Sequence, residues 1–181
     1  YLYGASLILT VLIFIPDLGM EHGGSTRWLN FGFISLQPSE PLKIGLVLML
    51  ASYFTMYRHK VDTLLFGFGG FAFICAPAVV LLLLQPDHGT LGVLIATAVV
   101  MYIVAGASKQ HLAVIAVGGV LMLTAVFFTH DYVRARIMTF LDPSRDPSGS
   151  SYQIQQSLNA LGSGGLTGRG FGRGIQKFQY L

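Results

Sequence analysis

Long apolar runs, separated by short polar intervals, dominate the pattern of this chain. Five such runs cover residues 1–16, 44–57, 63–86, 88–108 and 110–130, and the last three contain no Asp, Glu, Lys or Arg. A helix needs about 20 apolar residues to cross the roughly 30 Å hydrocarbon core of a bilayer. The pattern therefore predicts membrane-spanning helices at residues 1–15, 40–57, 63–84, 90–106 and 111–129.

The remainder of the chain, residues 131–181, is polar, charged and rich in glycine. Two stretches in it place apolar residues at helical spacing, which predicts short helices that could lie in the membrane interface. Asp131 is the expected N-cap of the first, Ser150 or Ser151 that of the second, and Gly162 is the expected end of the second. The glycines that follow predict either a strap that closes over a substrate or a simple connector.

Composition supports a membrane protein. Hydrophobic residues make up 53% of the chain and charged residues 10%, whereas a soluble domain usually carries about 25% charge. The mean hydropathy is +0.65. We therefore predict an all-α fold, a polytopic transmembrane helical bundle that forms a single membrane domain over residues 1–181, with helices and short loops in 1–130 and one large loop in 131–181. We expect membrane lipids, and no nucleic acid, among its partners.

Charge counting does not decide which way the chain crosses the membrane. An even number of expected spans separates the loop at residues 17–39 from the tail, so both lie on one face. That face carries most of the Arg and Lys residues, and the positive-inside rule would place it in the cytoplasm. Arginines that bind an anionic substrate do not indicate the orientation of the chain, however. The rule also applies to short loops, whereas the tail is long. The orientation stays open at this level.

Ionisable residues lie near the ends of the expected helices. Glu40 and Lys43 share one face of a helix and can form an ion pair, which either faces a cavity or only anchors the helix end. Arg27, next to Trp28, is either an interfacial anchor or a phosphate clamp, because a guanidinium group matches phosphate oxygens. The charged groups therefore favour a site at one membrane face.

Three aspartates are further candidates. Asp87 lies in a turn before His88, so it forms either a metal or acid–base pair with it or a cap of the next helix. Asp142 and Asp146 both precede proline, which favours extended backbone and an exposed carboxylate. Turn capping alone would explain one of these two.

Four polar motifs occur in an order that is typical of one known family. They are Gly24-Ser-Thr-Arg-Trp-Leu-Asn-Phe-Gly32, Ile34-Ser-Leu-Gln-Pro-Ser-Glu-Pro-Leu-Lys43, Gln85-Pro-Asp-His-Gly-Thr90 and Asp146-Pro-Ser-Gly-Ser-Ser-Tyr-Gln153. Together they resemble the SEDS family (shape, elongation, division and sporulation). The ending at residues 174–181 is more similar to the FtsW branch of that family than to the RodA branch.

The resemblance implies a peptidoglycan glycosyltransferase that acts in cell division or elongation. Such enzymes polymerise lipid II into β-1,4 glycan strands, release undecaprenyl pyrophosphate, and work with a class B penicillin-binding protein, a transpeptidase, within the division or elongation machinery. It further implies a multi-pass protein of the cytoplasmic (inner) membrane whose active site and residues 131–181 face outside. By the same resemblance, this chain is an internal part of a longer protein.

Matching the motifs residue by residue assigns roles to individual side chains. The family's essential loop aspartate falls on Asp146, its motif glutamate and lysine on Glu40 and Lys43, and we expect these three to be catalytic. Asp146 is also the expected ligand of a divalent cation, Mg²⁺ or Mn²⁺. The residues expected to bind substrate are Arg27, Gln37, Ser39, Arg145, Tyr152 and Gln153.

A flippase of a lipid-linked cell-wall precursor is the alternative from another functional class. Its transport cavity would also use Glu40, Lys43 and arginines. Transport requires access from both membrane faces, whereas polymerisation requires only the outer one. The concentration of polar groups on one face therefore favours the enzyme, and a scaffold without activity would leave the loop with Asp146 unexplained.

Overall fold

A computed structural model describes residues 1–16, 18–22, 25–30, 32, 35–129, 131–142, 151–170 and 172–174. The chain is mostly helical and divides into two compact units, Tyr1–Ile115 and Ala116–Leu181, which are described separately below. Arg145, Asp146 and the Asp-Pro-Ser-Gly motif lie outside the described residues, and so do the side chains of Asp131 and Gln153.

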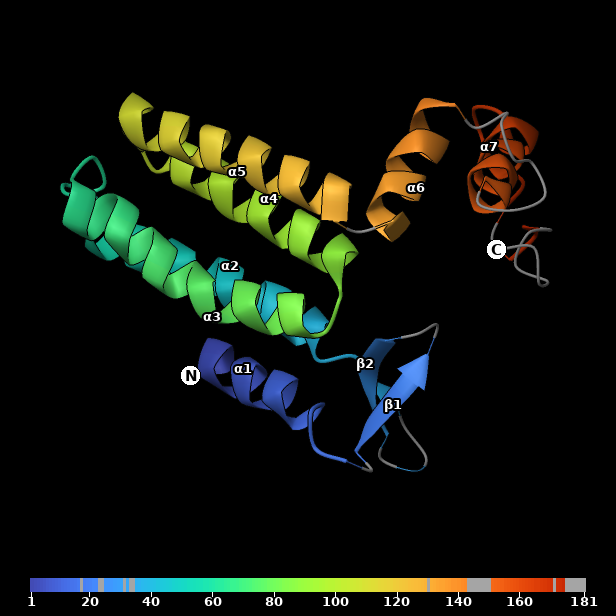
Figure 1. The fold of residues 1–181 in the computed structure, drawn as a ribbon, viewed down its shortest axis with the longest axis horizontal. Helices are drawn as coiled ribbons and strands as arrows, with labels where there is room; N and C mark the ends of the chain where they lie inside the picture. The colour runs from blue at the N-terminus through green and yellow to red at the C-terminus, as the bar shows by residue number, and fades with distance from the viewer. Residues whose placement is uncertain are drawn as a thin grey trace. The chain divides into compact units, whose positions relative to one another are not determined.

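The first unit combines helices with a small sheet (Figure 1). Its helices are α1 (Leu2–Leu12), α2 (Ser39–Met56), α3 (Gly70–Leu84) and α4 (His88–Val104), with a π-helical segment η1 (Leu64–Gly69) before α3 and the start of α5 (Lys109–Thr129). These elements confirm the predicted helical regions within a few residues of their expected bounds.

The sheet was not expected, because the hydropathy pattern predicts a loop over residues 17–39. Strands β1 (Gly19–His22), β2 (Ser25–Asn30) and β3 (Ser35–Leu36) form an antiparallel sheet in the order β1-β2-β3. A β-bulge interrupts the register of β1 and β2 after Met20. Leu29 of β2 is 1% exposed and is the buried apolar residue of this short sheet.

The core of the first unit lies among α2, α3 and α4. Leu42, Leu46 and Leu50 recur every four residues along one face of α2 and are 0–2% exposed. The residues of α3 and α4 that complete the centre of the core are Ala78, Leu82, Leu94, Ala98 and Tyr102.

Outward-facing positions of these helices are also apolar. Leu48, Phe73 and Val104 are 55%, 81% and 82% exposed. Helices that are apolar all round suit a membrane rather than water. Among the described residues, two helical segments are long and apolar enough to cross a bilayer, Leu64–Leu84 and Lys109–Thr129, whereas Leu2–Leu12 and His88–Val104 are apolar but shorter.

An aromatic cluster joins the helices near the 57–63 turn. The Tyr102 ring stacks against Phe54 of α2 and Phe71 of α3, with ring centroids 5.4 and 4.7 Å apart. Its hydroxyl lies 2.8 Å from His111 Nδ1 and donates to the Val61 carbonyl oxygen at 3.4 Å. One side chain therefore contacts three helices and the turn between α2 and η1.

The second unit contains the two short helices predicted in the tail, α6 (Asp131–Leu141) and α7 (Tyr152–Gly164). Ser151 occupies the N-cap position of α7, one of the two predicted, although its hydroxyl makes no capping hydrogen bond, and Ser150 lies outside the described residues. The helix also continues past Gly162 and ends before Gly165, whose φ of 55° is a conformation that favours glycine. Leu158 and Leu161 on α7 are 57% and 74% exposed, a pattern consistent with an interfacial helix.

Candidate functional site

Three elements of the first unit bring conspicuous polar residues to one end of the helices. Figure 1 shows β2 beside the start of α2 and the turn between α3 and α4. A hydrogen bond and an ion pair from β2 to the α3–α4 turn fix this arrangement. The motifs that contain Arg27, Glu40, Lys43 and Asp87 therefore meet at the same end of the unit.

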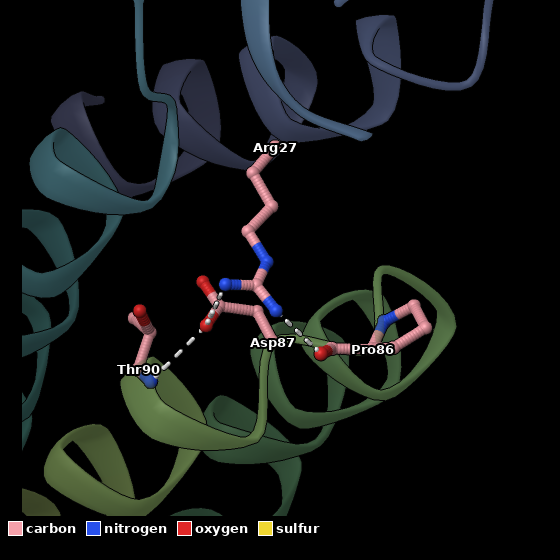
Figure 2. Close-up of polar contacts among 4 residues, drawn as sticks. All are labelled: Arg27, Pro86, Asp87 and Thr90. Atoms are coloured by element: carbon pink, nitrogen blue, oxygen red, sulfur yellow. Dashed lines mark hydrogen bonds and ion pairs between the residues drawn. The ribbon is translucent and has the colours of Figure 1, made fainter. Parts of the chain in front are cut away.

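Arg27 reaches from β2 to the α3–α4 turn (Figure 2). Its Nη2 donates to the Pro86 carbonyl oxygen at 3.0 Å, and its Nη1 lies 3.8 Å from Asp87 Oδ1. The side chain as a whole is 34% exposed, although its Nε is buried, so it is held by the turn and remains partly accessible. The sequence predicted Arg27 as an interfacial anchor or a phosphate clamp, and neither role anticipated its contacts with this turn.

Asp87 forms the other half of this contact. Its side chain is 5% exposed, and its Oδ1 accepts from the Thr90 backbone N–H at 3.3 Å, which confirms the interpretation of Asp87 as a cap of the following helix. Within the described part of the chain, Asp87 Oδ2 and Arg27 Nε are buried and have no hydrogen-bond partner.

The same turn is also bonded to α1. Gln85 is 3% exposed and its Nε2 donates to the Thr10 carbonyl oxygen at 3.1 Å. Successive residues of the turn thus contact α1 through Gln85 and β2 through Pro86 and Asp87. These contacts hold the α3–α4 turn, and with it the acceptors of Arg27, in place.

Glu40 and Lys43 lie at the beginning of α2. Lys43 Nζ donates to Glu40 Oε1 at 3.0 Å, and the two side chains are 33% and 58% exposed. The predicted ion pair therefore exists, but it is partly exposed to solvent in the part of the chain that the structure describes. Glu40 also lies in the first helical turn, where the positive end of the helix dipole favours a carboxylate.

An apolar cavity of about 260 Å³ lies between α2 and α4, with Lys43 among its lining residues. Ile44 and Val47 of α2 and Val93 and Met101 of α4 are among the others. An ammonium group together with an apolar groove suits a ligand that joins an anionic group to a hydrocarbon chain.

The other predicted site residues are distributed as follows. Gln37 is half-buried before α2, and Ser39 is 2% exposed, with an Oγ that has no hydrogen-bond partner among the described residues. Tyr152 begins α7 in the second unit and is 36% exposed. In the parts of the chain that the structure describes, no three His, Cys, Asp or Glu side chains form a group that could hold a metal ion.

Comparisons with known proteins agree with the motifs. The model of the FtsW, RodA and SpoVE cell cycle proteins matches residues 1–181. The chain belongs to this family. It is 37% identical to the probable peptidoglycan glycosyltransferase FtsW of Allochromatium vinosum, over 100% of this chain and 45% of that protein. It is 38% identical to the stage V sporulation protein E of Bacillus subtilis, over 96% of this chain and 47% of that protein.

Solved structures show the same likeness. A chain from a peptidoglycan synthase complex that coordinates polymerization and crosslinking is 38% identical, with a TM-score of 0.70 over 91% of this chain and 48% of that one. The rod shape determining protein RodA of Thermus thermophilus is 32% identical, with a TM-score of 0.53 over 67% of this chain and 39% of that one. This FtsW/RodA/SpoVE chain spans about half the length of the curated relatives that it matches.

Proposed function

We propose that this chain is part of a peptidoglycan glycosyltransferase that polymerises lipid II and releases undecaprenyl pyrophosphate. The observation that carries the proposal is that Arg27 and Lys43, the cations of two separate motifs, lie at one end of the same unit. The names of the relatives, which include peptidoglycan glycosyltransferases, support it. A lipid-linked diphosphate supplies both features that this end accommodates, an anion and a long hydrocarbon chain.

The chemistry requires a base and a means to stabilise negative charge. The acceptor hydroxyl loses a proton as it attacks the anomeric carbon, and the diphosphate leaves with additional negative charge. In this proposal Asp146 accepts the proton, Lys43 and Arg27 stabilise the diphosphate, and Glu40 holds the Lys43 ammonium group near the start of α2. A hard divalent cation bound by Asp146 would supply further positive charge at the diphosphate.

The remaining substrate contacts follow from the positions of the motif residues. We assign Gln37 and Ser39, beside the start of α2, and Arg145, Tyr152 and Gln153, in the tail, to the binding of the sugar and phosphate groups. The cavity between α2 and α4 would accept the first part of the polyprenyl chain.

The cellular setting belongs to the same proposal. The protein would lie in the cytoplasmic membrane and work with a class B penicillin-binding protein, which cross-links the peptides of the new strands. The likeness to a chain of a peptidoglycan synthase complex supports such a partner.

A reconstitution assay tests the proposed activity. The full-length protein, purified with its penicillin-binding partner, is expected to convert lipid II in detergent into glycan strands that are resolved on a gel. Blocking the transpeptidase with a β-lactam should leave this polymerisation intact. An absence of polymer, together with movement of lipid II across vesicles that contain the protein, would instead establish the flippase.

The outward orientation of the tail is tested by labelling in intact cells. Cys75 is the only cysteine and is buried in α3, so Cys75→Ala provides a background without thiols in this part of the protein. Ser148→Cys in that background is expected to react with a membrane-impermeant maleimide before lysis. Reaction only after lysis would place the tail in the cytoplasm and exclude the proposed mechanism.

A further inference from the structure

The contact between Arg27 and the α3–α4 turn is more specific than a surface ion pair. The guanidinium group lies between two acceptors of the turn, with Nη2 bonded to the Pro86 carbonyl oxygen and Nη1 facing the Asp87 carboxylate (Figure 2). Asp87 cannot move freely, because its backbone N–H donates to the Leu82 carbonyl oxygen at 3.0 Å and its Oδ1 caps α4. The turn therefore sets the orientation of the arginine.

The arginine retains unused hydrogen-bonding capacity. A guanidinium group has five N–H donors, and each terminal nitrogen has two of them. Each terminal nitrogen faces one acceptor of the turn, which leaves a second N–H on each for another ligand. Terminal N–H groups of a guanidinium are good donors to the oxygens of a phosphate group. The 34% exposure of the side chain leaves room for such a ligand.

The burial of the Asp87 carboxylate explains why it lies beside a cation. A carboxylate that is 5% exposed is unfavourable without a nearby cation and hydrogen bonds. Arg27 supplies the cation, and the Thr90 N–H supplies a hydrogen bond. The distance of 3.8 Å and the unpartnered Oδ2 show that the pair is not closed into a two-bonded bridge, so Arg27 is oriented without being fully saturated.

We propose that Asp87 is a positioning residue, which holds the Arg27 guanidinium group in the orientation that binds the diphosphate of the lipid-linked substrate. This inference rests on the proposed function, because it assigns Arg27 to the diphosphate. It gives Asp87 a role beyond the cap of α4, and it makes the effect of Asp87 depend on the presence of Arg27.

Asp87→Asn separates these two roles. Asn is as good an N-cap residue as Asp, so the variant retains the cap but loses the charge that orients Arg27. In the full-length protein with its partner, we expect the KM for lipid II and the inhibition constant for inorganic pyrophosphate each to rise about tenfold. This is the effect of losing about one charge-assisted hydrogen bond between Arg27 and the ligand. The value of kcat should change less than KM. Asp62→Asn is the matched control, since Asp62 is an exposed aspartate in the turn at residues 57–63.

A double-mutant cycle shows whether Asp87 acts through Arg27. In an Arg27→Ala background, Asp87→Asn should cause almost no further change in KM or in inhibition by pyrophosphate, because the group that it orients is gone. Arg27→Ala alone leaves the buried carboxylate without its cation, so the double variant should also melt at a higher temperature than Arg27→Ala. Independent effects that multiply in the double variant would overturn the proposal, and so would unchanged constants in Asp87→Asn.

A measurement without turnover keeps this proposal distinct from the proposed function. Calorimetric titration of inorganic pyrophosphate into the same preparations should show weaker binding to Asp87→Asn than to wild type and to Asp62→Asn. If wild type does not polymerise lipid II but this difference is found, the activity is wrong and the anion site stands. Equal binding to all three proteins refutes the site. Should Asp87→Asn fail to fold, Asp87→Ser retains an N-cap and replaces it in every measurement.

Discussion

Asp146→Asn in the full-length protein is expected to lower glycan polymerisation by about 10²- to 10⁴-fold, the usual contribution of a general base. The amide retains the size of the side chain and much of its hydrogen bonding, but it can neither accept the proton nor bind a cation as strongly. Expression and binding of the penicillin-binding partner should be normal. The measurement is the initial rate of lipid II polymerisation at matched protein levels.

Asp142→Asn is the control for this prediction. Asp142 also precedes a proline, but it directly follows α6, and its backbone N–H donates to the Met138 carbonyl oxygen at 2.9 Å. A place at the end of a helix accounts for it, so its variant should retain substantial activity. Polymerisation at the wild-type rate by Asp146→Asn would end the assignment, and the opposite ranking of the two variants would transfer the role to Asp142.

Lys43→Ala is expected to lower polymerisation by about 10²- to 10³-fold, the range found when one preorganised group that stabilises a transition-state anion is removed. Its ion pair with Glu40 is exposed, and an exposed pair contributes about 0–1 kcal/mol to stability. The variant should therefore insert and fold normally. Initial rates, compared with the melting temperature of the same preparation, separate the two effects.

Lys60→Ala is the matched control for Lys43→Ala. Lys60 lies in the turn at residues 57–63, where its Nζ is 4.6 Å from the centre of the Phe66 ring, and it belongs to none of the motifs. Its loss should leave the rate near that of wild type. Normal polymerisation by Lys43→Ala would reduce the Glu40–Lys43 pair to an anchor of the α2 terminus.

The helices could be predicted because their signal is local. Each apolar run extends over many residues, and the turns between them contain charged residues, Gly or Pro, so hydropathy alone located α1 to α5. The short helices α6 and α7 followed from apolar residues at helical spacing. The sheet could not be predicted in this way, because its strands have only two to six residues and few apolar positions.

The sequence predicted which residues belong to the candidate site, but it did not predict all the contacts between them. Motifs identified Arg27, Glu40 and Lys43, and the spacing of Glu40 and Lys43 gave their pairing, since residues three apart are neighbours on a helix. Arg27 and Asp87 are separated in the chain by α2, η1 and α3, and neither spacing nor composition relates them. Their contact depends on how β2 packs against the α3–α4 turn, which only the folded unit reveals.

The position of Tyr102 limits which substitutions this chain can accept there. Its ring stacks on Phe54 and Phe71, and its hydroxyl donates to the Val61 carbonyl oxygen and lies within hydrogen-bond distance of His111 Nδ1. A change to Phe would retain the stacking but deprive the imidazole of its partner, and a change to Leu would remove both. A substitution at Tyr102 would therefore disturb α2, α3, α5 and the turn at residues 57–63 at the same time.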